Sequence, residues 1–379
     1  MRGSIQNRSK GSWRIRYDGP ADTNGNRKQE SETVRGTRKE AESVLRERIT
    51  AVENGGYAPK YDQTVTEFMQ TWMQTYVKTN TTPRTQQGYL GSIRRYIEPN
   101  LGHIKLQALR PEQIQGLYSK LLEQGLSGRT VLHVHRVFRQ ALKHAVRWNM
   151  VIRNPTDAVI PPRPESKPVE MWDVPLIHRF IEASKASHYA DLFLLGVLTG
   201  MRRSELCGLR WENVNLATGR LMVLVTLQRI TGNGLVEGQP KTQKSRRSIA
   251  LSVSAIDLLH IVRGNQIEHR ARVEPAWMDA GYVFTKADGR PVDPDEVTHA
   301  FKKIVDDSGL PHLTLHGLRH AHATLLLASG VHLKIVSERL GHSTITTTAD
   351  IYSHVLPGMQ EIAANAIDDQ LGGRVGERS

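Results

Sequence analysis

Four prolines near the middle of the chain, Pro161, Pro162, Pro164 and Pro168, limit how this sequence can fold. Proline fixes one backbone torsion and has no amide hydrogen, so a run of prolines forms a stiff linker rather than a helix or a strand. This run is the clearest domain boundary in the chain. With 379 residues, the chain exceeds one typical domain, and we expect two or three.

Basic residues gather before that linker. Residues 1–60 carry 13 Lys and Arg against 8 Asp and Glu, and residues 61–165 carry 14 against 7. Residues 166–379 are nearly neutral, with 24 against 23, although the whole chain has a net charge of +13. A polyanion is the natural partner of such a front half. The alternative is a basic surface that is merely solvated.

The composition indicates a soluble protein of a reducing compartment. Mean hydropathy is −0.43, and no apolar run reaches the length that spans a membrane. Residues 1–10 have no apolar signal core. Cys207 is the single cysteine, which excludes an intramolecular disulfide and fits the cytosol. We therefore expect a cytoplasmic protein with no membrane partner.

Residues 1–56 are predicted to form a small domain, a three-stranded sheet plus one helix. Aromatic and apolar residues alternate with Arg14 and Arg16, as in a half-exposed strand. An Asn-Gly turn leads to another strand, and Thr37 with Glu40 forms a capping box that opens the helix. One face of the sheet could lie in a DNA groove, which makes both arginines candidates for DNA contact. The alternative is an accessory domain without a ligand.

Residues 62–160 show a helical pattern. Apolar residues recur every three or four positions, as at Phe68, Trp72 and Tyr76, and are predicted core. The exposed remainder is basic enough to form a face that tracks DNA phosphates. The candidates for DNA contact in this region are Arg94, Arg95, Arg136, Arg139 and Lys143.

Residues 170–357 are predicted to be helices with one small antiparallel sheet. The stretch 221–230 alternates as a strand does, a Gly-Asn-Gly turn follows, and 247–251 returns. Lys241 is expected in the loop of this sheet. The tail 358–379 carries a modest apolar stripe that could dock on a neighbouring protomer or pack on its own domain. The expected fold class is α+β and mostly helical.

The motifs of common cofactor sites are missing. His316 and His320 would share one helical face, but Gly317 occupies the position where a zinc protease requires Glu. No other Cys, His or acidic cluster has the spacing of metal ligands. A phosphate-binding GxxxxGK[ST] loop and a GxSxG elbow are also absent. We expect no metal and no other cofactor.

The stretch 316–355 gathers polar residues at the ends of short helical patterns. His316 and Arg319 fall in a first helix, His342 in the turn after a second, and Tyr352 late in a third. Such an arrangement can bring side chains from distant positions around one anionic group.

Together with Arg202 and Lys241, these residues suit phosphoryl transfer. The guanidiniums of Arg202 and Arg319 can bind the non-bridging oxygens of a phosphodiester and stay charged. Tyrosine is a poor nucleophile at its free pKa of about 10. Beside arginines and histidines, the phenolate of Tyr352 is favoured and can attack phosphorus. Lys241 can protonate the leaving sugar hydroxyl. A phosphotyrosyl link conserves the bond energy, so rejoining requires neither ATP nor metal.

Taken singly, each residue also has a structural interpretation. Arg202 can simply pair with Glu205. Lys241 can belong to a surface charge run that continues to Arg247. The histidines can cap a helix or pack in a turn, and a tyrosine is more often structural than catalytic.

The order of the residues resembles a family's order. Four separated motifs carry the likeness: TGMRRSELCGLRW, PKTQKSRRSIAL, HGLRHAHATLLLASG and LGHSTITTTADIYSHV. In sequence and spacing they resemble the catalytic domain of tyrosine recombinases, specifically phage-type integrases. The resemblance covers about residues 170–357 and is highly specific, because all four motifs match.

The resemblance implies a role for each matching residue. Lys244 lies close enough to Lys241 to compete for its role, and His320 receives none. The implied roles are Tyr352 as nucleophile, Arg202 and Arg319 as catalytic arginines, His316 from HxxR, His342 from LGH, Lys241 as general acid and Glu205 as supporting acid.

The front half is similar in layout to integrases in which an arm-type DNA-binding domain (1–56) precedes a helical core-binding domain (62–160). The resemblance implies a site-specific recombinase that integrates, and also excises, a phage or other mobile element through a 3′-phosphotyrosyl intermediate. Its expected partners are double-stranded DNA attachment sites, a homotetramer on DNA, and an accessory DNA-bending or directionality protein, at the nucleoid of a bacterial cell. The alternatives are topoisomerase IB-like DNA relaxation and a non-catalytic DNA-binding regulator.

Overall fold

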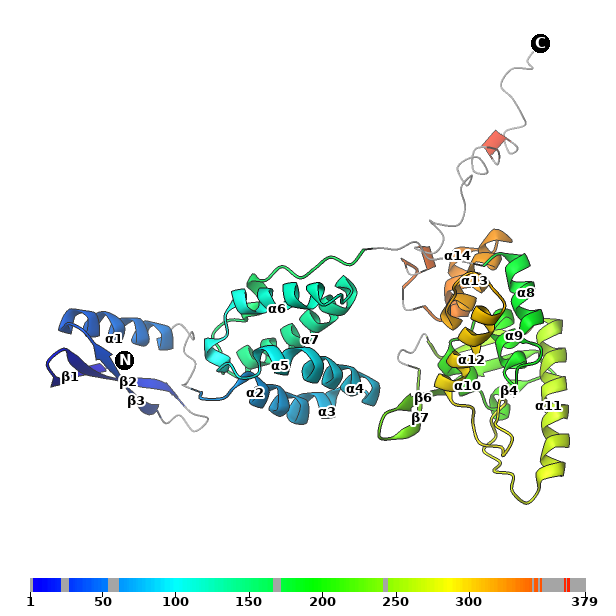
Figure 1. Ribbon diagram of the computed structural model, residues 1–379, viewed down its shortest axis with the longest axis horizontal. Helices are drawn as coiled ribbons and strands as arrows, with labels where there is room; N and C mark the ends of the chain where they lie inside the picture. The colour runs from blue at the N-terminus through cyan, green and yellow to red at the C-terminus, as the bar shows by residue number, and fades with distance from the viewer. Residues whose placement is uncertain are drawn as a thin grey trace, which may run out of the picture. The chain divides into compact units, whose positions relative to one another are not determined.

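The computed structural model divides the chain into two compact units, Met1–Lys167 and Pro168–Ser379 (Figure 1). The described residues are 3–21, 27–53, 61–165, 172–240 and 245–342, together with positions 344–346, 348, 349, 365, 367 and 368. They are mostly helical with small antiparallel sheets, which confirms the predicted fold class. Among these residues, no helix combines the length and the apolar character that crossing a membrane requires.

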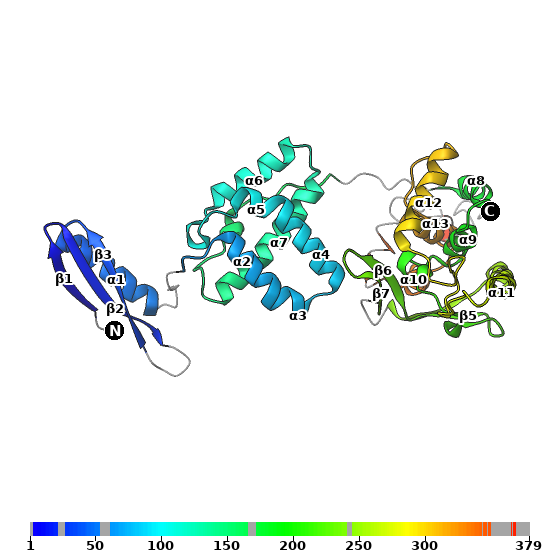
Figure 2. The ribbon, with the colours of Figure 1, turned by 60° about the horizontal axis from the view of Figure 1, so that its bottom comes forward.

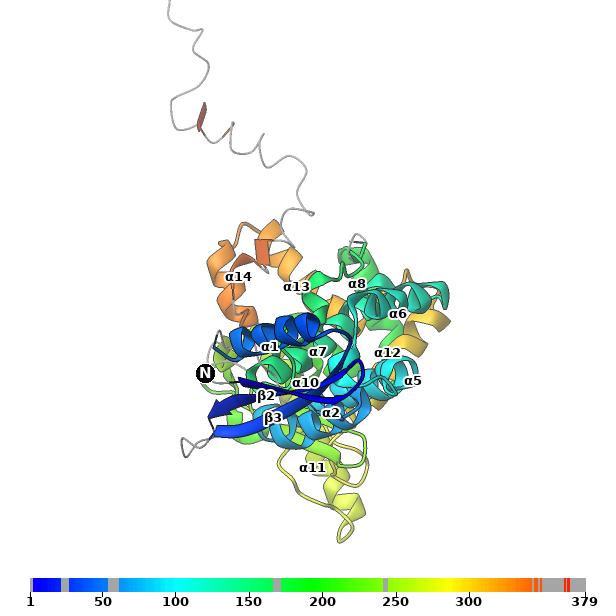
Figure 3. The same ribbon diagram turned by 90° about the vertical axis from the view of Figure 1, so that its left-hand side faces the viewer.

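The first unit begins with a three-stranded antiparallel sheet in the order β1-β2-β3. Helix α1 lies over one face of this sheet (Figure 1, Figure 3). Ile15 and Tyr17 point into that interface and pack with Ala41 and Leu45 of the helix. The capping box forms as predicted, since the Glu40 carboxylate accepts from the Thr37 amide at 2.6 Å. The bounds are β1 Gly3–Ser9, β2 Ser12–Ala21, β3 Arg27–Arg35 and α1 Arg38–Glu53.

A helical bundle follows in the same unit. Thr64, Thr82 and Ser127 cap its helices through their hydroxyls. The core is mostly aliphatic, and within it buried Trp72 donates from Nε1 to His144 Nδ1 at 2.9 Å. The bounds are α2 Val65–Trp72, η1 Met73–Val77, α3 Lys78–Asn80, α4 Pro83–Ser92, η2 Ile93–Ile97, α5 Glu98–Leu101, η3 Leu106–Ala108, α6 Pro111–Glu123, α7 Gly128–Arg147 and η4 Pro155–Ala158.

The second unit packs its helices around one hydrophobic core. Trp172, Phe180, Phe193 and Phe301 meet at its centre, with ring centroids 4.8 to 6.1 Å apart. Burial of each such ring contributes roughly 1.5–3 kcal/mol. The bounds are α8 Val174–Ser184, α9 Ala190–Thr199, α10 Arg203–Cys207, η5 Trp211–Asn213, α11 Val253–Val273, α12 Pro294–Asp307, α13 Leu315–Ala328 and α14 Leu333–Leu340.

The strands of this unit correct one prediction. The stretch 221–230, predicted as one strand, is two strands in two different sheets. Leu221 and Val223 face the core, but Thr226, Leu227 and Ile230 are buried next, so the alternation changes phase and the chain leaves the first sheet. β6 and β7 form a separate hairpin (Figure 2). The bounds are β4 Val214–Asn215, β5 Arg220–Val223, β8 Arg247–Ala250 in the first sheet, and β6 Thr226–Ile230, β7 Gly234–Gly238 in the hairpin.

Candidate active site

The end of α9 lies against α13 and α14. Gly200 ends α9 with φ of +66°, a conformation that other residues rarely adopt. A Cβ atom there would come within 2.6 Å of His322 Cδ2 and 2.8 Å of Leu340 Cδ2. Glycine at this position therefore allows the close approach of three helices. That approach brings Arg202, which follows Gly200 by two residues, next to Arg319 on α13.

Buried Glu205 on α10 holds two arginines. Its Oε1 accepts from Arg202 Nη1 at 2.7 Å, and its Oε2 accepts from the Arg202 amide at 2.9 Å. Arg247 of β8 donates to the same oxygens from Nη1 at 3.1 Å and Nη2 at 2.9 Å. Burial would raise the pKa of Glu205, but the hydrogen bonds and charges of Arg247 and Arg202 outweigh it and hold the pKa below its ordinary value. The carboxylate therefore stays ionised inside the protein.

Three consecutive carbonyls at the end of α14 each accept from a different arginine. Arg247 Nε donates to the Arg339 carbonyl at 2.6 Å, Arg319 Nη2 donates to Leu340, and Arg202 Nη2 donates to Gly341 at 3.1 Å. The last carbonyls of a helix have no partner within the helix and carry its negative dipole end. Guanidiniums supply both the missing donors and the opposite charge. The end of α14 is thus the scaffold on which the arginines converge.

Gly341 also turns the chain toward His342. With φ of +66° it forms a Schellman turn, in which the His342 amide donates to the Ser337 carbonyl at 3.1 Å. His342 Nδ1 lies 2.8 Å from Thr348 Oγ1. Burial, followed by Arg319, Arg202 and the other histidines, lowers the pKa of His342 to about 4.

His316 lies in the first turn of α13, after the Thr314 cap. Its ring and that of His320 meet edge to face at 4.9 Å. Burial, then the charges of His320, Arg319 and Arg202, lowers the pKa of His316 to about 4. Arg319 and Arg202 lower the pKa of both His316 and His342, so these four residues of the predicted site lie close together. With pKa values of about 4, the imidazoles of His316 and His342 are uncharged at neutral pH. Each can therefore donate one hydrogen bond to an anion without adding charge.

Arg319 is nearly inaccessible, at 2% exposure, and its Nη1 donates to the Gly200 carbonyl at 2.7 Å. Burial and the nearby Arg202 lower its pKa to about 9, which leaves it charged at neutral pH. Arg202 is different, because 32% of its side chain is exposed. Of the two guanidiniums, Arg319 is therefore the one covered by protein and Arg202 the one whose side chain is accessible.

The comparison with known proteins decides the family. A "tyrosine recombinase XerC-like" protein of Caldanaerobacter subterraneus subsp. tengcongensis is 33% identical over 351 residues, which cover 88% of this chain and 90% of that protein. The chain belongs to the phage integrase family. The family model described as "Phage integrase family" matches residues 172–358, and "Phage integrase, N-terminal SAM-like domain" matches residues 64–122. The protein is therefore a tyrosine site-specific DNA recombinase, as its motifs predict.

Other members of the family and solved structures agree. The "ICEBs1 integrase" of Bacillus subtilis is 26% identical over 76% of this chain and 78% of that protein. The fold matches the Tn1549 transposon integrase in complex with transposon right end DNA, with a TM-score of 0.69 at 23% identity over 82% of this chain and all of that one. It also matches a lambda integrase tetramer bound to a Holliday junction, with a TM-score of 0.59 at 16% identity over 92% and 94%.

Two residues predicted for the site lie outside the described residues of the recombinase. These are Lys241, together with its competitor Lys244, and Tyr352. The predicted Asn-Gly turn at 24–25 and most of the tail 358–379 lie outside them as well. The structure brings together Arg202, Glu205, His316, Arg319 and His342.

Arg247 is the residue whose position the sequence argument missed. It appeared there only as the end of the surface charge run that was the alternative interpretation of Lys241, whereas the structure buries it, at 8% exposure. The available signal was the alternation along β8 and the residue before it: Arg247 shares its face with buried Ile249, while Arg246, just before the strand, and Ser248 face outward. Arg246 instead donates to the Gln239 side chain.

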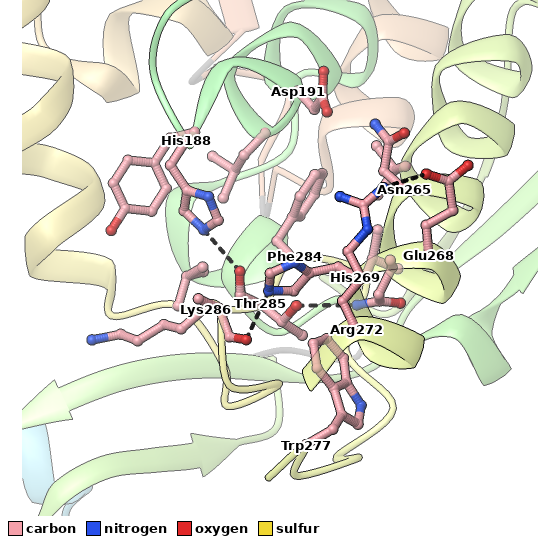
Figure 4. A pocket seen from close by; sticks show the side chains of 17 residues that line it. His188, Asp191, Asn265, Glu268, His269, Arg272, Trp277, Phe284, Thr285 and Lys286 are labelled. Carbon is pink, nitrogen blue, oxygen red and sulfur yellow. Dashed lines mark hydrogen bonds and ion pairs between the residues drawn. The ribbon is translucent and has the colours of Figure 1, made fainter. Parts of the chain in front are cut away.

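The second unit has two concavities among its described residues. One of about 440 Å³ borders the cluster and is lined by Arg247, Lys334 and His342, among others. The second, of about 400 Å³, lies at the opposite end of α9 and is lined by Asp191, His188 and Trp277, among others (Figure 4). None of the predicted site residues within the described ranges lines the second. In those ranges, no three His, Cys, Asp or Glu side chains are arranged as metal ligands.

Proposed function

We propose that this recombinase integrates and excises a mobile element by cutting and rejoining DNA through a 3′-phosphotyrosyl link at Tyr352. One observation carries the proposal. Arg202 and Arg319, far apart in the sequence, donate to adjacent carbonyls at the end of α14, directly before His342, and His342 precedes Tyr352 by ten residues. A cationic pocket and the predicted nucleophile therefore share one short segment of chain.

Each residue then has a chemical task. The tyrosine phenolate attacks phosphorus, and the phosphorus bond to the 5′ oxygen breaks. Arg202 and Arg319 stabilise the charge that develops on the non-bridging oxygens, and the uncharged His316 and His342 add hydrogen bonds. Lys241 gives the leaving 5′ oxygen its proton. Attack by a 5′ hydroxyl on the phosphotyrosine reverses every step, so the cycle consumes neither ATP nor a metal ion.

Residues 170–357 would carry this chemistry, while the two preceding regions hold the DNA. In the arm region 1–56, Arg14 and Arg16 lie on the sheet face opposite α1, because Ile15 and Tyr17 point toward the helix. Polar residues stand beside them across the strands: Gln6 and Thr33 flank Arg14, and Ser4 and Ser31 flank Arg16. A polar, basic sheet face of this kind suits a DNA groove.

In the core-binding region 62–160, helix α7 presents a long polar stripe. Positions spaced four and three residues apart fall within a narrow sector of the helix and face outward. Over 18 residues the stripe runs for about 27 Å, enough to follow several phosphates. Arg94 and Arg95 of η2 are exposed as well. The stripe consists of Arg129, His133, Arg136, Gln140, Lys143 and Arg147.

Arg139, also predicted to contact DNA, lies off that stripe. Its Nε donates to Asp157 at 2.8 Å, so part of its charge is already paired. We expect Arg136→Ala and Lys143→Ala each to weaken DNA binding by roughly the same factor on any sequence and to lower the salt slope of the affinity by about 1, because each removes a phosphate contact.

The measurement is DNA affinity by titration at several salt concentrations. Lys120→Ala on α6 serves as the control, since Lys120 is bonded to Asn100 Oδ1 at 2.8 Å. Equal salt slopes for wild type, Arg136→Ala and Lys143→Ala would contradict the assignment of the stripe.

We further propose that the recombinase assembles as a tetramer on double-stranded attachment sites, with the tail 358–379 docking on a neighbouring protomer and an accessory DNA-bending or directionality protein assisting. The described lambda integrase, a dimer on a core site and a tetramer on a Holliday junction, supports this assembly. The bacterial relatives support action at the nucleoid, in the cytoplasm.

The test of the function uses a nicked suicide substrate built from the DNA that flanks the gene. Purified recombinase should form a covalent protein–DNA adduct on it, and intact sites should recombine, at unchanged rates in a chelator and without ATP. Relaxation of a plasmid that lacks any such site, or binding to the site with no adduct, would contradict the proposal.

A further inference from the structure

Arg247 joins the three segments on which the proposed chemistry depends. Within the described residues its guanidinium donates to both carboxylate oxygens of Glu205, at 3.1 and 2.9 Å, to the Arg339 carbonyl at 2.6 Å and to the Ser245 carbonyl at 3.2 Å. The side chains of this ion pair are 6% and 1% exposed. Burying two charges is expensive unless their geometry is good, and a bidentate pair is the geometry that best offsets the cost.

Each of those contacts leads to a predicted catalytic group. Glu205 holds Arg202 through its Oε1, at 2.7 Å from Nη1. The Arg339 carbonyl lies three residues before His342 and next to the carbonyl that Arg319 binds. On its own strand, Arg247 opens β8, six residues after Lys241.

Most of the N–H donors of Arg247 are hydrogen-bonded to acceptors within the protein. Of the five guanidinium N–H groups, four are needed for the bonds to Glu205, Arg339 and Ser245. Arg202, by contrast, has an accessible side chain. The contacts therefore point to a residue that sets the position of others rather than one that binds the phosphate.

We propose that Arg247 is a positioning residue of the recombination reaction, which fixes Arg202 relative to His342 by clamping Glu205 to the end of α14. This inference rests on the proposed function. When the clamp is lost, Glu205 keeps Arg202 as its partner and Arg202 keeps its bond to the Gly341 carbonyl, but Glu205 is no longer tied to β8 and the Arg339 carbonyl. A displacement of the order of 1 Å at a reacting group costs about a hundredfold in rate.

The experiment compares Arg247→Gln with Arg246→Gln, its neighbour in the sequence, which faces outward. Single-turnover adduct formation on the suicide substrate is measured with the full chain at saturating protein, well below the unfolding temperature of each variant. We expect Arg247→Gln to slow adduct formation about a hundredfold with DNA affinity within about twofold of wild type. Arg246→Gln should match wild type. Arg247→Lys, which keeps the charge but not the bidentate fork, should recover part of the rate.

A purely structural role makes a different prediction. It would lower the unfolding temperature of Arg247→Gln and leave the rate constant of the folded protein unchanged. If Arg247 acts through Glu205, the double variant Glu205→Gln, Arg247→Gln should be no slower than the slower single variant, because the two residues share one task. Multiplying rate losses would overturn the inference.

The outcomes separate this inference from the function on which it rests. If wild type forms no adduct, the proposed function fails. If wild type forms the adduct and Arg247→Gln forms it equally fast, the function stands and the positioning role fails. Should Arg247→Gln not fold, Arg247→Lys decides, since a rate equal to wild type for that variant would also overturn the role.

Discussion

Replacing Tyr352 by phenylalanine is expected to abolish the covalent DNA adduct while leaving DNA affinity within about twofold of wild type. Phenylalanine keeps the ring and removes the one oxygen that the proposed reaction joins to phosphorus. Losing a covalent nucleophile typically costs at least about 10⁴-fold in rate, because the remaining groups stabilise charge but cannot form the bond. The arginines and the α7 stripe, which are proposed to hold the DNA, are unchanged in this variant.

The comparison is made on the nicked suicide substrate, by denaturing gel for the adduct and by native gel for binding. Tyr282 provides a matched control, because its hydroxyl already donates to Glu237 and its ring lies under Arg210. Tyr282→Phe should form the adduct at the wild-type rate. An adduct trapped with Tyr352→Phe would refute the assignment of the nucleophile and, with it, the order of events proposed for strand exchange.

Arg202→Ala is expected to slow adduct formation about 10²- to 10³-fold with a small loss of stability. The guanidinium contacts would strengthen as charge develops on the phosphate, so the variant should lose cleavage far more than binding. Stability should change little, because Arg202 is 32% exposed and Glu205 keeps Arg247 as its partner.

Arg203→Ala is the control, matched in residue type, position and exposure. Arg203 is 35% exposed but donates to the Pro294 carbonyl at 2.9 Å and to Asp295 at 3.2 Å, away from the cluster. Arg203→Ala should lower the unfolding temperature by a few degrees and leave the rate of adduct formation unchanged. Arg319→Ala should lower both the unfolding temperature and the rate of adduct formation. It leaves the buried Gly200 and Leu340 carbonyls without a donor, at about 1–3 kcal/mol each. Equal adduct rates for Arg202→Ala and Arg203→Ala would contradict the proposed role of Arg202.

Local rules predicted much of the fold. The Thr37–Glu40 capping box opens α1 as predicted, because both residues act on their own neighbours. Pro83 at the start of α4, and Gly200 and Gly341 at the ends of α9 and α14, act in the same local way. The division of 221–230 into two sheets could not be predicted in this way. That stretch leaves the first sheet because its buried face changes, and burial depends on partners far away in the chain.

The sequence by itself determined the family and suggested the proposed chemistry, because the four motifs keep their residues and spacing whatever surrounds them. The tertiary structure decided how the charges are held. Three arginines donate hydrogen bonds to three consecutive carbonyls at the end of α14, and Glu205 binds two of those arginines. The spacing of residues along the chain cannot reveal these contacts. A helix-end carbonyl accepts from a distant guanidinium only when packing brings the two together and excludes the water that would compete for the carbonyl. Arg246 and Arg247 show the difference: they are adjacent and chemically identical, but at the start of β8 the first is exposed to solvent and the second is buried among the residues of the site.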